Sequence, residues 1–202
     1  MPRREGPLKR KRIIASALKA FSEKGYHQAR ISEIAEEALV AKGTIYLYFR
    51  NKEELFLASL DDVAREFLSQ LSQELDRAGD ALARLKRIIH FHLTFLDKNV
   101  EIFSILEREL PADLSRKLRA GAKQKQRLEA YLETMEKILL QGQREGQLEP
   151  PGGPAFAAQA LWGILHAVGH QRLSERDRRP VDEVARDVIH QFFYGVCRER
   201  KP

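Results

Sequence analysis

Apolar residues recur at helical spacing along almost the whole 202-residue chain, and this periodicity limits the folds open to it. Residues 8–24 show the pattern clearly, with apolar positions at Ile13, Ile14, Ala17, Leu18 and Phe21. No segment shows the alternation of apolar and polar residues that a half-buried strand requires. The sequence therefore predicts an all-α protein of about nine helices.

Capping and turn residues set the expected boundaries of these helices. Gly25 is a typical stop after the first helix, Ser32 is a candidate N-cap of the second, and Asn51 with Glu54 resembles a capping box at the fourth. "EGQLEPPGGP" at 145–154 is a strong turn signal. Further helices are expected at 81–97, 100–109, 112–143 with a candidate kink at Gly121, 155–169 and 181–196.

The net charge of +6 is unevenly distributed. Residues 1–52 hold 12 Lys and Arg against 5 Asp and Glu, whereas the other 150 residues hold 23 against 24. A basic module on a neutral body indicates that the module alone meets a polyanion, with nucleic acid ahead of an anionic membrane surface. We therefore divide the chain into a nucleic-acid-binding domain at 1–52 and a larger helical domain at 53–202.

The segment at 155–169 is apolar on most of its circumference, and 181–196 has a broad apolar face. Such helices must be buried on most sides, and a second subunit is the simplest cover. We expect a homodimer through the last two helices. No apolar run is long enough to cross a bilayer and no secretory signal is visible, which predicts a cytoplasmic location.

"KGTIYLYFRN" at 42–51 follows a short helix and a turn, as in a helix-turn-helix. Ile45 and Phe49 are one turn apart and face inward, whereas Lys42, Gly43, Tyr46 and Arg50 fall outward. Outward donors and small residues suit base edges, and helix starts suit phosphates. The candidate DNA-binding residues are Ser32, Lys42, Gly43, Thr44, Tyr46, Tyr48 and Lys52, with the basic arm at 9–12 adding charge.

"FSEKGYHQARISEIAEEALVAKGTIYLYFRNKEELF" at 21–56 resembles the DNA-binding domain of TetR-family transcriptional regulators. The matching pattern includes Phe21, Gly25, Ser32, Ile34, Ala35, the run from Gly43 to Tyr46, Tyr48, Phe49 and the run from Lys52 to Leu55. The chain departs from this pattern at Leu39, where the family has glycine, and at Ala41, where it has a Ser or Thr cap. A left-handed Leu39 and a lost cap each cost on the order of 1 kcal/mol, too little to change the assignment.

The resemblance implies a ligand-responsive repressor that binds a palindromic operator as a dimer and is released by a small effector. Residues 25–35 and 42–54 look most like the fatty-acid-degradation branch of the family, whose members respond to long-chain acyl-CoA. A multidrug-type regulator of efflux genes that senses lipophilic compounds is the alternative. The candidate effector residues are His92, Phe95, Phe103, Leu106, Arg108, Trp162 and His166.

Other classes of protein find less support in the sequence. No phosphate loop, dinucleotide fingerprint or nucleophile elbow is present, so we expect neither an enzyme nor a bound cofactor. His166 and His170 are four residues apart, but no third ligand is evident, which favours a pocket or dimer interface over a metal site. A basic membrane-surface adaptor would account for the arm at 9–12 but not for the outward Thr44 and Tyr46.

Overall fold

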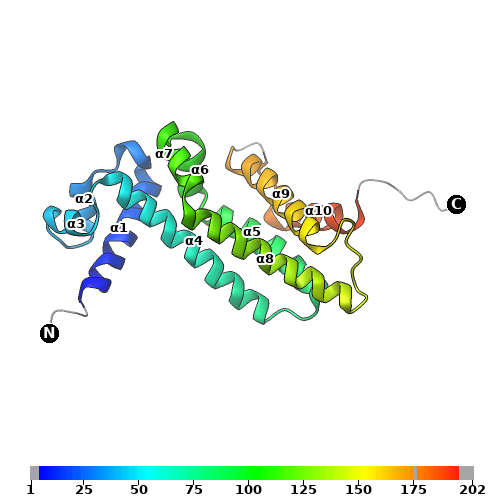
Figure 1. Cartoon of the computed structure of the whole chain (residues 1–202). Helices are drawn as coiled ribbons and strands as arrows, with labels where there is room; N and C mark the ends of the chain where they lie inside the picture. The colour runs from blue at the N-terminus through cyan, green and yellow to red at the C-terminus, as the bar shows by residue number, and fades with distance from the viewer. Residues whose placement is uncertain (1–4, 175–176, 196–202) are drawn as a thin grey trace. The chain divides into compact units, whose positions relative to one another are not determined.

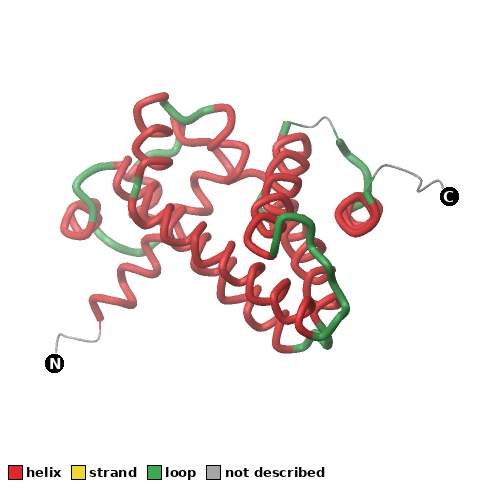
Figure 2. The backbone as a smooth tube through the Cα atoms, turned by 45° about the vertical axis from the view of Figure 1, so that its right-hand side comes forward, coloured by secondary structure: helices red, strands yellow, loops and turns green. Residues whose placement is uncertain are grey.

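The computed structural model describes residues 5–174 and 177–195, and in these ranges the chain forms helices joined by loops (Figure 2). The helices are α1 (Glu5–Gln28), α2 (Ile31–Glu37), α3 (Lys42–Tyr48), α4 (Lys52–Asp76), α5 (Ala81–Lys98), α6 (Val100–Arg108), α7 (Ala112–Ala120), α8 (Ala122–Arg144), α9 (Pro154–Leu173) and α10 (Val181–Tyr194) (Figure 1). The all-α prediction is confirmed.

The described ranges hold ten helices, one more than the approximate number predicted. The difference arises at Gly121, where the backbone is extended (φ −63°, ψ 131°) and divides the expected helix at 112–143 into α7 and α8. The kink expected there is therefore a complete break. At the other end of the chain, Val196 and Cys197 lie outside the described residues, and α10 ends at Tyr194, followed by Gly195 with a φ of 69°.

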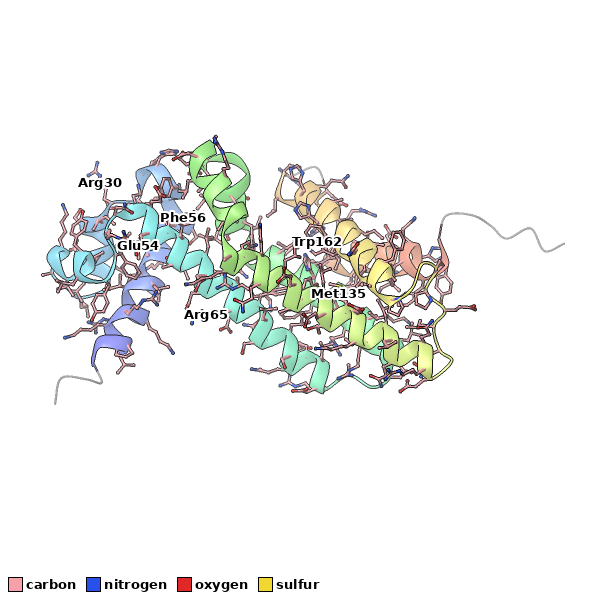
Figure 3. All side chains as sticks on the ribbon, viewed as in Figure 1. Arg30, Glu54, Phe56, Arg65, Met135 and Trp162 are labelled. Carbon is pink, nitrogen blue, oxygen red and sulfur yellow. The ribbon has the colours of Figure 1, made fainter. Side chains whose placement is uncertain are left out.

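The first of two compact units comprises residues up to 67 together with 99–124. Its core joins α1, α2, α3 and the start of α4 to Ile102 and Ile105 of α6 and Leu114 of α7. Aromatic rings fill its centre: Phe56 of α4, labelled in Figure 3, lies edge-on to Phe21 with ring centroids 5.0 Å apart. Burial of rings of this size stabilises the unit and holds the short helices α2 and α3 in place.

Gly25 interrupts α1 with a backbone conformation (φ 76°, ψ 171°) that residues other than glycine rarely adopt. Beyond it, the Tyr26 N–H donates to the carboxylate of Glu109, at 2.9 Å, and His27 Nε2 lies 3.0 Å from the Glu109 carbonyl oxygen. The residue that follows α6 therefore holds the last turn of α1. The predicted stop at Gly25 is confirmed as a break in the helix.

The second unit comprises residues 68–98 and 125–202 and is described at 68–174 and 177–195. Its core contains Leu85, Ile88, Ile89 and Leu93, all fully buried on α5, which packs against α9 and α10. Arg172 of α9 donates to Asp97 at the end of α5 (Nε to Oδ1, 2.8 Å) and to the Arg179 carbonyl oxygen (3.0 Å). These contacts hold the end of α9 and Arg179, just before α10, against the end of α5.

The two units interleave along the sequence, because α6 and α7 belong with α1, α2 and α3. The division of function at residue 52, inferred from the charge distribution, stays a prediction. Within the described ranges, none of the helices combines the length and hydropathy needed to span a membrane.

Candidate nucleic-acid interface and effector residues

The candidate interface is built on α3, a helix of seven residues that is held from behind. Ile45 and Phe49 are 1% and 2% exposed and pack in the same core as Ile34 and Ala35 of α2 and Ala38, the residue after it. This is the inward face predicted from the spacing. Because Ile45 and Phe49 both anchor this short helix in the core, α3 has a fixed orientation. Its opposite side faces solvent.

The outward side of α3 carries Lys42, Gly43, Tyr46 and Leu47, all exposed. Tyr46 is 47% exposed, and a Cβ added to Gly43 would meet nothing within 4 Å. Thr44 and Tyr48 lie at the margins of this face and are half-buried. The surface thus combines an ammonium group, hydroxyl groups and open backbone, which can donate to base edges and phosphates.

The turn before α3 contains Leu39 in the left-handed region, with φ 53°. The Leu39 N–H donates to the Glu36 carbonyl oxygen at 3.0 Å and the Val40 N–H to the Ala35 carbonyl oxygen at 2.9 Å. The conformation that glycine normally supplies is therefore adopted by leucine, as the departure from the family pattern suggested. Ala41 gives α3 no side-chain cap, and only its carbonyl oxygen is used, by the Thr44 N–H at 2.8 Å.

The prediction that Ser32 caps α2 is wrong. The helix begins at Ile31, with Arg30 in the N-cap position and no side-chain cap hydrogen bond from it. Instead the Glu33 carboxylate accepts the Arg30 N–H at 3.4 Å, and the helix starts two residues earlier than a cap at Ser32 would give. The contact of Ser32 with DNA stays a prediction.

The start of α4 matches the capping prediction for Asn51. Its Oδ1 accepts the Glu54 N–H at 2.8 Å, while the Glu54 carboxylate, labelled in Figure 3, accepts the Arg50 N–H at 2.7 Å. This backbone hydrogen bond is the main reason why the pKa of Glu54 is lowered. The reciprocal bond reaches Arg50 rather than Asn51, but the helix end is closed as a capping box would close it.

Lys52 has an intramolecular role besides the predicted one. Its Nζ donates to the His27 carbonyl oxygen at 3.0 Å and lies 4.9 Å from the centre of the Tyr26 ring. Partial burial lowers the pKa of Lys52. The ammonium group thus ties α4 to the end of α1, and its contact with a phosphate stays a prediction.

The basic arm at 9–12 lies within α1, not in a separate extension. Arg10 stacks over the Phe49 ring, with its Cζ 5.3 Å from the ring centre, while Lys11 and Arg12 are exposed. Part of the arm is therefore used to cover the end of α3. Lys11 and Arg12 remain available for a polyanion.

In the second unit, the interior carries a hydrogen-bonded polar pair. His92 Nδ1 of α5 lies 3.0 Å from the hydroxyl oxygen of Tyr131 on α8, which is 5% exposed. Burial, with a smaller contribution from His166 of α9, lowers the pKa of His92 to about 4. Burial also raises the pKa of Tyr131. Both side chains are therefore uncharged near neutral pH.

Trp162, labelled in Figure 3, contacts His166 on the same helix, with ring centroids 5.1 Å apart. The structure thus brings His92, Trp162 and His166 into one region of the second unit. Tyr131 was missed from the sequence, although its spacing with Met135, Ile138 and Leu139 on the buried side of α8 was the available signal. Phe95 is 6% exposed and lies against Phe91.

The other candidate effector residues belong to the first unit. Phe103 and Leu106 are half-buried against its core. Arg108 ends α6, and its side chain lies outside the described residues. The effector roles of all seven candidates stay predictions.

Comparison with known proteins shows to which family the chain belongs. Residues 13–59 match the family of bacterial regulatory proteins named after tetR, and residues 60–193 match the C-terminal region of YsiA-like proteins. A fatty acid metabolism regulator protein from Bacillus subtilis is 31% identical over 156 residues, covering 76% of this chain and 77% of the relative. The chain belongs to the TetR family.

Solved structures of TetR-family regulators have the same fold. FadR from Bacillus subtilis, crystallised in complex with stearoyl-CoA, is 25% identical, with a TM-score of 0.74 over 93% of this chain and 99% of that one. FadR from Bacillus halodurans, a fatty acid degradation regulator, is 26% identical, with a TM-score of 0.75 over 93% and 96%. These similarities confirm the predicted resemblance to the fatty-acid branch of the family.

In this TetR-family protein, one exposed residue of α3, Leu47, was not predicted from the sequence. Leu47 is 83% exposed, the highest value among the large apolar residues that the structure describes. It lies on the side of α3 opposite Ile45, where there is no core for its side chain to enter. That angular position was the signal that could have identified it.

Proposed function

We propose that this TetR-family protein is a repressor that binds a palindromic DNA operator as a homodimer and is released by a long-chain acyl-CoA. The observation that carries the DNA-binding part is the outward face of α3, defined here as Lys42, Gly43, Tyr46 and Leu47, on the module that holds the excess positive charge. A rigidly anchored helix with exposed donors suits a major groove.

Dimerisation is supported by the surfaces of α9 and α10. On α9, Leu161 and Leu165 are buried, whereas the opposite side exposes Phe156, Ala160, Gly163 and Ala167. Phe156 is 61% exposed and Tyr194, at the end of α10, is 68% exposed. Small residues between large apolar ones allow close approach of a second helix, and covering them would remove apolar surface from water.

An acyl-CoA effector is supported by the stearoyl-CoA bound to FadR from Bacillus subtilis and by the interior of the second unit. The neutral pair of His92 and Tyr131 offers hydrogen bonds without a charge, in an interior of leucine, isoleucine and phenylalanine. That chemistry suits a thioester on an apolar chain better than a lipophilic cation, which needs an acidic partner. A regulator of fatty acid metabolism genes is the corresponding biological role.

Replacing Tyr46 tests whether the outward face of α3 is the face that reads the operator sequence. An operator is first selected by the protein from random duplexes, and each variant is then titrated against that operator and against unrelated DNA. Tyr46→Ala should lose most of the preference for the operator, by about 10-fold or more if a base contact of 1–3 kcal/mol is removed, and should still form the dimer.

Arg12→Ala is the matched control, since it removes an exposed cation of the arm. It should weaken binding to both duplexes alike and reduce the slope of log K against log salt by about 0.9 for each subunit bound. If Tyr46→Ala protects the same operator with undiminished preference, the assigned reading face is wrong.

A further inference from the structure

Gly43 and Leu47 form the outermost line of α3. They are four residues apart, one helical turn, and each lies two positions from Ile45, which places them opposite the residue that anchors the helix. Gly43 has open space where a Cβ would be, and Leu47 is 83% exposed. The part of α3 that would enter a groove first is therefore a bare backbone position followed by an isobutyl group.

The surroundings of Leu47 limit what it can contact. The exposed neighbours on α3 are Lys42, Gly43 and Tyr46, so Leu47 is the one exposed aliphatic side chain of this helix. A protein or membrane partner bound through apolar contact would need a wider patch. The module also carries 12 Lys and Arg against 5 Asp and Glu in residues 1–52, which selects a polyanion.

These two requirements, a polyanion and a single apolar group, are met together in the major groove of DNA. Its base edges present hydrogen-bond donors and acceptors and one apolar substituent, the C5-methyl group of thymine. We infer that Leu47 contacts a thymine methyl in each operator half-site and so reads a T·A pair. This inference rests on the proposed DNA-binding function and adds a specificity-determining residue to it.

Deoxyuridine gives a direct test, because it differs from thymidine only by the missing methyl group. The operator selected by the protein is synthesised with deoxyuridine at each thymine position in turn, symmetrically in both half-sites. At one position the unmodified protein should bind about fourfold more weakly per half-site, the effect of losing one buried methyl group. Leu47→Ala should bind the thymine and deoxyuridine operators with equal affinity at that position.

Leu8→Ala is the matched control, since Leu8 is an exposed leucine of the same unit, at 68%, but lies on α1. This variant should keep the full penalty for deoxyuridine. The inference is overturned if no deoxyuridine substitution weakens the unmodified protein, or if Leu47→Ala shows the same penalty. Selection of no duplex at all would instead overturn the proposed function together with this inference.

Discussion

Among the residues other than glycine that the structure describes, Leu39 is the one with a positive φ. Its φ of 53° lies in the left-handed region, while its side chain is 80% exposed and contributes little burial. A left-handed leucine costs on the order of 1 kcal/mol, and asparagine tolerates this region better. Leu39→Asn should therefore raise the free energy of unfolding by about 0.5–1 kcal/mol, measured by urea denaturation.

Leu47→Asn is the comparison for this substitution, because Leu47 is equally exposed but helical. That variant should be unchanged or slightly less stable, since asparagine has the lower helix propensity. Equal shifts in the two variants would show that the conformation of Leu39 carries no strain.

For individual residues, the sequence predicted those roles that follow from local spacing along a helix. The inward positions of Ile45 and Phe49 and the cap at Asn51 are of this kind. The cap at Ser32 was predicted wrongly because the Glu33 carboxylate, not the serine hydroxyl, accepts the hydrogen bond at that helix start. Lys52 donates a hydrogen bond to the His27 carbonyl oxygen, 25 positions away in the sequence, and spacing alone does not indicate this contact.

Among the helices, the end of α1 depends on Gly25. Its conformation strongly favours glycine, and a Cβ there would collide with the Glu109 carboxylate. Gly25→Ala should therefore lower the free energy of unfolding by about 2–3 kcal/mol, combining backbone strain with the lost Tyr26 contact. Thermal and urea unfolding of the purified variant would measure this.

Gly43→Ala is the matched variant, because Gly43 is helical and has open space around it. Alanine there should leave stability unchanged or raise it by up to about 1 kcal/mol. If Gly25→Ala is as stable as the unmodified protein, the hold of Glu109 on the end of α1 does not matter to the fold.

Helix positions were largely predictable, since apolar spacing, Gly25, Pro111 and "EGQLEPPGGP" mark most ends. The separation of α7 from α8 was expected only as a kink, because a single glycine does not reveal whether the helix resumes in the same direction. The association of α6 with α1 was not predicted. It rests on the core shared with Ile102 and Ile105 and on a hydrogen bond between residues 83 positions apart, Tyr26 and Glu109, and no local pattern encodes such a pairing.

At the scale of the whole molecule, the proposed function combines a basic module that reads DNA with an apolar unit that binds the effector. The charge asymmetry, the exposed face of α9 and the neutral His92 and Tyr131 pair each support one part of it. The similarity to FadR proteins from two Bacillus species supports their combination in one regulator. In the proposed function they are connected by release of DNA when the effector binds, which requires the effector to prefer the conformation that does not bind DNA.

Native mass spectrometry of the protein with its selected operator, before and after addition of long-chain acyl-CoA, tests whether the effector releases DNA. We expect a dimer on the duplex that takes up one acyl-CoA per subunit and leaves the DNA, while free coenzyme A has no effect. A dimer that stays on the operator with every acyl-CoA, and binds none of them, would contradict it and favour an efflux-type regulator of lipophilic compounds.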